Sequence, residues 1–250
     1  MNTSAVTVKG LVKRFGKILL FKDFSVEIEP RKITAIFGPN GSGKSTLLNI
    51  IAGITTPDKG ERTIDKDKEF RLSYIFQNYR DSLFPWRTNF ENIAFPLEIQ
   101  GLSKEEIRKR VEELQTVFEF QFDWNAYPYQ LSGGQQQILA FIRALVTRPT
   151  LLLIDEPFSA LDYENNLLLR KHLLRYYESY RPTVLIITHN IEEAVHLSHR
   201  ILVLGKNPTT ILDTIENGIP FPRSIDALKS ETFHRIKDKV LQTFQRSTSI

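Results

Sequence analysis

The sequence contains no cysteine, and a single methionine is its only sulfur-bearing residue. Disulfide bonds and thiolate metal sites are therefore excluded. Long hydrophobic runs are also lacking, since Leu151–Ile154 and Val184–Ile187 are far shorter than the roughly 20 residues that a membrane helix needs. The first ten residues, MNTSAVTVKG, show no apolar stretch of the kind that secretory signals carry. We therefore expect a chain that does not cross a bilayer by itself.

Composition places the chain among globular proteins. Its 250 residues suffice for one large or two small domains, and 41% hydrophobic with 25% charged residues is an ordinary balance. The net charge of +4 would permit contact with nucleic acid or anionic lipid. However, the basic residues are interspersed with acids, as in the segment KEEIRKRVEEL at 104–114. This pattern favours a solvated surface, and we expect no nucleic-acid partner.

The string GPNGSGKS at 38–45 is a phosphate-binding motif in a suitable context. It fits G-x-x-x-x-G-K-[ST], in which backbone N–H groups surround phosphates, the lysine contacts the β- and γ-phosphates and the last hydroxyl reaches Mg²⁺. A short apolar run, KITAIF, precedes it, and TLLNIIAG follows as a helix that should stop at Gly53. Strand, glycine loop and helix are the order that such a site requires. The candidate residues are Gly38, Pro39, Asn40, Gly41, Ser42, Gly43, Lys44, Ser45 and Thr46.

A second candidate anion site lies at residues 131–135, which read LSGGQ. Ser132 and Gln135 have the spacing of a capping box, so Ser132 should begin a helix. Gly133 and Gly134 leave the first N–H groups of that helix uncovered, and such groups attract a phosphate. A plain helix cap is the alternative for an isolated string of this kind.

Two adjacent acids, Asp155 and Glu156, follow the apolar run at 151–154. The carboxyl end of a buried strand faces the crevice in which an α/β sheet binds its ligand. Asp155 suits the Mg²⁺ shell, with water between them, because Mg²⁺ keeps several of its waters. Glu156 is placed to orient or deprotonate an attacking water.

This ordered set of motifs resembles the nucleotide-binding subunit of an ABC transporter, from about Val6 to Leu204. The resemblance identifies Gln77 as a ligand of Mg²⁺ and the attacking water, and His189 as a contact of the γ-phosphate. It places Asp162, in the string SALD, at a loop that links two subunits' sites. It also implies that Phe15 stacks on adenine, although a core position is the alternative for this side chain.

The resemblance implies a P-loop NTPase of the α/β class with a RecA-like core and a mostly parallel sheet. Strand patterns near 33–37, 72–76, 150–154, 183–187 and 201–204 alternate with helical ones, as such a sheet requires. We assign this core to 1–77 and 149–210, with an antiparallel β subdomain near its start. A helical signature subdomain is expected at 78–148, where FEFQFDW at 118–124 suggests a short extended piece. A C-terminal extension at 211–250 carries a helical stripe and is expected to be weakly tied.

The resemblance also implies an activity and partners. Two subunits would close head to tail around two ATP molecules with Mg²⁺, so that the signature of one meets the phosphate loop of the other. The partners expected are a second copy or a homologous ATPase subunit, a membrane permease and an extracytoplasmic solute-binding protein. The chain would then lie on the cytoplasmic face of the membrane. Coupling would pass through residues 78–95, where Trp86 either packs locally or lies at a partner surface.

The segments at 76–92, 155–162 and 204–224 resemble the importer branch for nitrate, sulfonate or taurine. Because the ATPase does not touch the cargo, site chemistry does not decide the substrate. An exporter ATPase and a soluble ABC ATPase that takes no part in transport remain the alternatives. The second is disfavoured because it usually carries a second ATPase domain or a long coiled-coil insertion.

Overall fold

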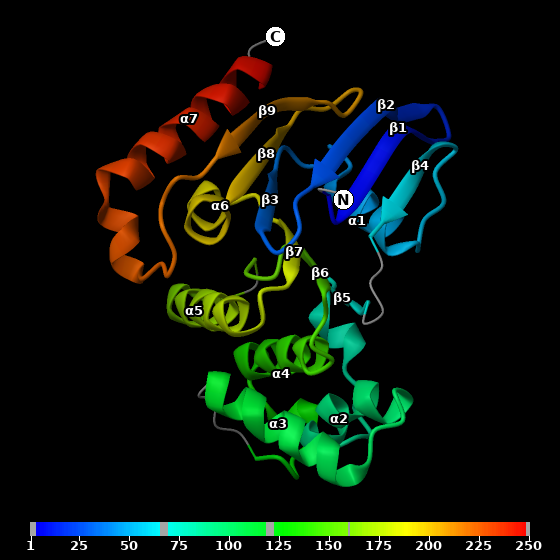
Figure 1. Ribbon diagram of the computed structural model, residues 1–250, viewed down its shortest axis with the longest axis vertical. Coiled ribbons are helices and arrows are strands. Elements are labelled where there is room, and N and C mark those ends of the chain that lie inside the picture. Colours follow the sequence, from blue (N-terminus) through cyan, green and yellow to red (C-terminus); the bar gives the residue numbers. More distant parts are fainter. Residues whose placement is uncertain (1–3, 66–69, 119–122, 160, 249–250) are drawn as a thin grey trace.

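The computed structural model describes residues 4–65, 70–118, 123–159 and 161–248. Figure 1 shows two sheets in the upper part of the molecule and a lobe of helices below them. The strands are β1 (Val6–Phe15), β2 (Ile18–Ile28), β3 (Ile33–Phe37), β4 (Lys59–Ile64), β5 (Leu72–Ile75), β6 (Leu151–Asp155), β7 (Thr183–Ile187), β8 (Arg200–Leu204) and β9 (Ile211–Glu216). The helices are α1 (Lys44–Ala52), α2 (Asn89–Ile99), α3 (Lys104–Phe118), α4 (Gly133–Leu145), α5 (Tyr163–Tyr180), α6 (Ile191–Leu197) and α7 (Glu231–Thr248), with short 3₁₀ turns η1 (Tyr79–Ser82), η2 (Pro128–Gln130) and η3 (Ile225–Lys229).

The larger sheet has the order β5-β6-β7-β3-β8-β9, and all of its neighbouring pairs are parallel except β8 and β9. Strands β3, β6 and β7 have five residues each, and every one of them is buried. Helices or the second sheet cover both faces of the large sheet at these strands. In β3, Ile33 and Ala35 belong to one hydrophobic cluster and Ile36 to the other. The predicted α/β class with a mostly parallel sheet is confirmed.

The smaller sheet has the order β2-β1-β4 and is antiparallel throughout. Its buried residues pack with one face of α1 and with the large sheet in a single cluster that includes Val8, Phe21 and Leu47. The predicted antiparallel region beside the phosphate loop is therefore present. Helix α1 ends at Gly53, whose φ of 82° is the left-handed value expected of a glycine cap.

The helical lobe at the bottom of Figure 1 consists of α2, α3 and α4. Two capping boxes begin its helices: Thr88 with Glu91 at α2, and Ser103 with Glu106 at α3. The expected extended piece at 118–124 falls mostly at 119–122, outside the described residues. None of the described helices combines the length and the apolar character that crossing a bilayer requires.

The C-terminal segment is tied firmly to the core, so the expectation of weak attachment was wrong. Strand β9 pairs antiparallel with β8 and adds an edge to the large sheet. Helix α7 lies along β9 in Figure 1, and its Phe233, Ile236 and Val240 are buried in the larger hydrophobic cluster. The Phe244 ring lies 5.4 Å from that of Phe37, at the end of β3. The stripe that the sequence showed in this helix therefore faces the core.

Candidate functional site

The loop between β3 and α1 needs glycine at three positions. Gly43 is the N-cap of α1 with φ of 83°, and Gly41 has φ of 79°, both in the left-handed region. At Gly38 the constraint is space, because a Cβ atom there would lie 2.9 Å from the carbonyl oxygen of Leu204. These glycines let the backbone turn tightly, as a loop whose N–H groups surround a phosphate requires.

Lys44 lies in the wall of this loop rather than in solvent. Its side chain is buried, and Nζ donates hydrogen bonds to the carbonyl oxygens of Gly38 at 3.0 Å and Pro39 at 2.9 Å. Burial lowers the pKa of this ammonium group, while the nearby Glu156 and Asp155 carboxylates raise it. The first turn of α1 carries no acidic residue, so its N-terminus adds to the positive potential.

A cavity of about 420 Å³ opens onto the loop and is lined by most of the predicted phosphate-loop residues. Asn40, Lys44 and Ser45 line it together with Gln77 and Glu156 from elsewhere in the chain. Phe15, at the end of β1, closes one side and is 52% exposed, with the Lys13 ammonium 5.3 Å from its ring centroid. A half-exposed aromatic ring at the rim of a phosphate site argues against the alternative of a core position.

The two acids after β6 have different environments. Asp155 is buried, and burial raises the pKa of its carboxyl, although a hydrogen bond from Ser45 opposes the shift. Its Oδ1 atom has no hydrogen-bond partner within the described part of the chain. Glu156 has a left-handed φ of 45°, an unfavourable value for this residue type that is found disproportionately at functional sites.

The three predicted catalytic residues meet at one oxygen atom. The Gln77 amide donates to Oε2 of Glu156 at 3.3 Å, and Nδ1 of His189 lies 3.1 Å from the same atom. These residues come from the ends of β5, β6 and β7, three neighbours in the sheet. Parallel strands thus bring together side chains that are 79 and 33 positions from Glu156 in the sequence.

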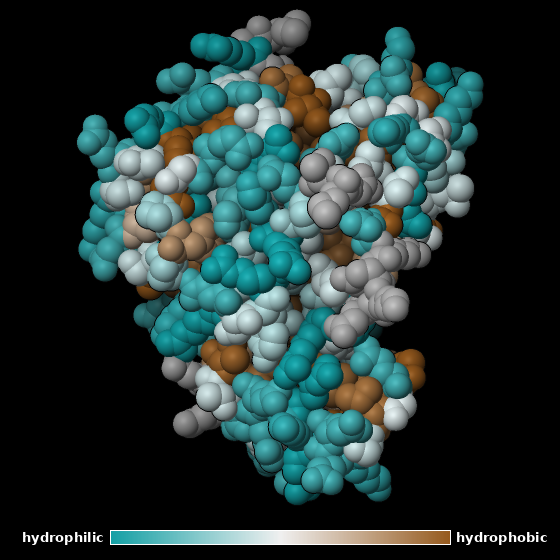
Figure 2. Space-filling view, viewed as in Figure 1, coloured by the Kyte–Doolittle hydropathy of each residue, from teal (hydrophilic) through white to brown (hydrophobic). Residues whose placement is uncertain are grey.

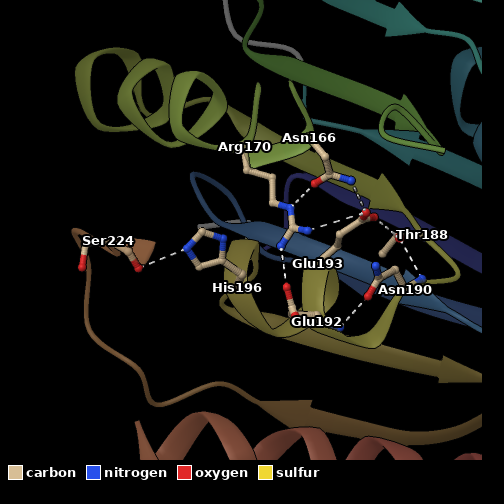
Figure 3. A network of polar contacts seen from close by, with 8 residues as sticks. All are labelled: Asn166, Arg170, Thr188, Asn190, Glu192, Glu193, His196 and Ser224. Carbon is tan, nitrogen blue, oxygen red and sulfur yellow. Dashed lines mark hydrogen bonds and ion pairs between the residues drawn. The ribbon is translucent and has the colours of Figure 1, made fainter. Parts of the chain in front are cut away.

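Thr188, which precedes His189 in the chain, belongs to a buried polar network that the sequence did not predict (Figure 3). The Thr188 hydroxyl donates to Oε2 of Glu193, and the Asn166 amide donates to Oε1 of the same carboxylate at 3.0 Å. Arg170 contacts Asn166 and pairs with Glu192 at 3.4 Å. The network links the start of α5 to the loop that carries His189. Asn190, which follows that histidine, caps α6, and its side-chain oxygen accepts a hydrogen bond from the Glu192 N–H at 2.9 Å.

The signature string and Asp162 occupy helix starts, and neither lines the cavity at the phosphate loop. Ser132 and Gln135 form the predicted capping box at α4, with distances of 3.3 and 2.9 Å. Asp162 caps α5, accepting from the N–H of Asn165 at 2.9 Å, and this bond lowers the pKa of Asp162. The capping residues Ser132 and Asp162 are exposed to solvent, and Gly133 and Gly134 are half-buried.

Comparison with known proteins agrees with this geometry. The family model described as ABC transporter matches residues 21–159. The aliphatic sulfonates import ATP-binding protein SsuB of Bacillus cereus is 38% identical over 96% of both chains. A sulfate/thiosulfate import ATP-binding protein, CysA of Bradyrhizobium diazoefficiens, is 41% identical over 80% of this chain and 61% of its own length.

Solved structures of ABC transporter cassettes also resemble this chain. A bacterial ABC transporter cassette solved as a dimer superposes with a TM-score of 0.73 at 31% identity, covering 86% of this chain and all of the other. A second structure, of a cassette in a post-hydrolysis state with ADP and Pi, matches with a TM-score of 0.73 at 32% identity. The chain therefore belongs to the ABC transporter family, and it is an ATPase.

Proposed function

We propose that the chain is the ATP-hydrolysing subunit of an importer for a small sulfur oxyanion, an aliphatic sulfonate or sulfate. The convergence of Gln77 and His189 on the Glu156 carboxylate, beside the phosphate loop, is the observation that carries the hydrolytic part. The relatives described above, which are named for sulfonate and sulfate import, support the substrate class. Each role below is our assignment for this chain.

In this proposal ATP lies in the 420 Å³ cavity with its adenine ring on Phe15. Residues 38–46 surround the phosphates, and Lys44 exchanges its two backbone partners for the β- and γ-phosphate oxygens. Glu156 takes the proton of the attacking water, because its carboxylate is the acceptor on which the other two side chains converge. Gln77 and His189 hold that water in line with the γ-phosphate.

The residues at the end of β6 suit a Mg²⁺ ion. The buried Oδ1 of Asp155 lacks a partner, and the Ser45 hydroxyl lies beside the same carboxyl group. Oxygen donors of this kind are the ligands that Mg²⁺ prefers. Ser45, Gln77 and Asp155 would hold the ion, and a bound Mg²⁺ would neutralise charge on the β- and γ-phosphates.

A second subunit is needed because the chain's own signature residues lie outside its nucleotide cavity. The backbone N–H groups at Gly133 and Gly134, in the first turn of α4, would meet the γ-phosphate held by a second copy or a homologous ATPase subunit. Asp162 starts the helix beside that interface. A related cassette has been solved as a dimer, which supports this arrangement.

The helical lobe carries a surface suited to a permease. Trp86 is 72% exposed beside Phe84, and the Arg143 guanidinium lies 4.3 Å from the Phe84 ring centroid. Arg87 stacks at 4.7 Å over Phe95 on α2. Aromatic and arginine side chains of this kind dominate protein interfaces, and Figure 2 shows apolar residues exposed in this lower part of the molecule. The permease, with a solute-binding protein outside, would place the chain at the cytoplasmic face of the membrane.

The test reconstitutes the chain with its permease and solute-binding protein in liposomes, with ATP inside the compartment that faces the ATPase. We expect ATP-dependent transport of an aliphatic sulfonate or of sulfate, and a loss of turnover of about 100-fold or more in Glu156→Gln with ATP binding retained. Glu61→Gln, which removes an exposed acid from β4, is the matched control. Wild-type turnover in Glu156→Gln would contradict the hydrolytic assignment, and transport of neither anion would contradict the substrate class.

A further inference from the structure

A second and larger cavity, of about 710 Å³, lies at the amino-terminal ends of strands in the large sheet. It includes Leu151 and Thr183, the first residues of β6 and β7. These strands are parallel, so their first residues lie at the opposite end of the strands from Asp155 and the phosphate loop. The volume is within the range of small-molecule sites. Nothing in the proposed ATPase mechanism uses this cavity.

Four separate connections each contribute one arginine to the cavity. Arg31 comes from the turn between β2 and β3, Arg71 from the segment before β5, Arg148 from the link between α4 and β6, and Arg181 from the link between α5 and β7. Among the described lining residues, Asp65 is the one acid. The wall therefore has an excess of positive charge that is assembled from distant parts of the chain.

Backbone geometry sets three of these arginines apart. The φ angles are 55° at Arg31, 50° at Arg148 and 48° at Arg181, all in the left-handed region that favours glycine. Arg181 is the C-cap of α5, a position that glycine or asparagine usually takes. A cation at a helix C-terminus is favourable by itself, and this is sufficient reason for Arg181 taken alone. It does not account for Arg31, which follows a strand.

Neighbouring groups hold the arginines in place while leaving charge in excess. Arg148 pairs with Glu113 and lies 5.2 Å over the Tyr180 ring, and Arg181 lies 5.0 Å over the Tyr177 ring. Arg31 and Arg181 are exposed to solvent. Burial lowers the pKa of the neighbouring Arg110 guanidinium, and the positive charges of Arg148 and Arg71 lower it further. The region is thus electropositive enough to affect a cation beside it.

We propose that this arginine cavity binds a compact multivalent oxyanion that carries phosphate or sulfonate groups. The exposed guanidinium groups of Arg31 and Arg181 match oxygen atoms distributed over such an anion, because a planar guanidinium can donate two parallel hydrogen bonds. Arg71, whose Nε donates to the Arg148 carbonyl oxygen at 3.0 Å, and Arg148 add positive charge to the same wall. The cavity is separate from the nucleotide site, so the proposal stands or falls independently of the ATPase assignment.

The experiment titrates the full-length protein with inorganic pyrophosphate and, separately, with ethane-1,2-disulfonate, by calorimetry at constant ionic strength. The two probes distinguish a phosphate from a sulfonate ligand. Arg31→Gln and Arg181→Gln each remove one lining charge without adding a residue that suits the left-handed backbone better. We expect each to weaken binding about tenfold, the effect of losing one charge-assisted contact. Arg235→Gln, on the exposed side of α7, makes the same charge change elsewhere and should leave binding unaltered.

Lys44→Ala separates the two sites, because pyrophosphate can also enter the phosphate loop. Binding that survives Lys44→Ala and weakens in Arg31→Gln and Arg181→Gln supports the proposal. The proposal is overturned if neither probe binds to the Lys44→Ala protein, or if Arg235→Gln weakens binding as much as the cavity variants do. Wild-type melting temperatures of the Arg31 and Arg181 variants would show that lost binding does not reflect lost folding.

Discussion

Removal of the Glu193 carboxylate tests the buried polar network that includes Thr188 and Arg170. Glu193 is 5% and Arg170 1% exposed, and Nη2 of Arg170 lies 4.0 Å from Oε1 of Glu193. Glu193→Ala would therefore leave a buried guanidinium with Glu192, at 3.4 Å, as its ionic partner among the described residues. The Thr188 hydroxyl and the Asn166 amide would also lose their shared acceptor. Breaking a buried ion pair costs about 3–5 kcal/mol. Because Glu192 is 31% exposed at its side chain and stays in place, we expect the lower end, about 3 kcal/mol.

The assay is thermal unfolding, in which 1 kcal/mol corresponds to a shift of about 2–4 °C for a protein of this size. Glu193→Ala should therefore lower the Tm by about 6–12 °C. Glu192→Gln, which removes the more exposed acid, is the matched control and should cost less than about 1 kcal/mol. Adding Arg170→Gln to Glu193→Ala should recover part of the loss, because the uncompensated charge is then gone.

The same variant has a kinetic consequence. The network holds Thr188 next to His189 and touches no residue of the phosphate loop, so turnover should fall more than ATP affinity does. A Tm change of less than 2 °C in Glu193→Ala, or an equal loss in Glu192→Gln, would refute the reasoning about the buried charge. Equal losses of turnover and ATP affinity in Glu193→Ala would refute the inference that the network positions His189.

Three further outcomes follow from single side chains. Lys44→Ala should abolish turnover and weaken fluorescent ATP-analogue binding at least tenfold through lost charge-assisted hydrogen bonds, whereas Lys32→Ala, a surface control, should not. Phe15→Ala should weaken ATP binding by about 1–3 kcal/mol and Phe15→Trp should preserve it, as stacking requires; unchanged affinity in Phe15→Ala would count against stacking. Burial lowers the pKa of His196 to about 4 from 6.5, so its unfolded form takes up the proton first on acidification. The contribution of His196 to stability should fall by up to about 3 kcal/mol from about pH 6.5 to 4, and His196→Gln should lack this contribution in urea titrations at each pH.

Sequence patterns predicted those parts of the fold that local chemistry determines. The apolar run before Gly38, the glycine that ends α1 and the capping box of Ser132 and Gln135 each require only a few neighbouring residues. The structure has all three where they were expected. The meeting of Gln77 and His189 at Glu156 came from the resemblance, since no local pattern reports which strands are neighbours.

Features that depend on distant pairing were missed. Strand β9 lacks a clean alternation of buried and exposed residues, and its place is decided by pairing with β8. The stripe on α7 was visible, but its contact with Phe37 is a tertiary fact. Arg170 and Glu193 read as surface charges on two helices, and they are buried because Asn166, 27 positions from Glu193, completes their hydrogen bonds.

The signature helix offers a test of whether the site is shared between subunits. Gly133→Asp adds a negative charge where the partner's γ-phosphate should lie, yet an acid in the first turn of α4 favours the helix itself. The variant should fold and bind ATP in its own loop but fail to dimerise with ATP, while the neutral Gly133→Asn should be impaired less. Mixing Gly133→Asp with Lys44→Ala subunits leaves one composite site with an intact loop and an intact signature. Partial recovery of ATP-dependent dimers in that mixture, measured by light scattering, is expected; normal dimerisation of Gly133→Asp alone would show that Gly133 does not act on a partner's nucleotide.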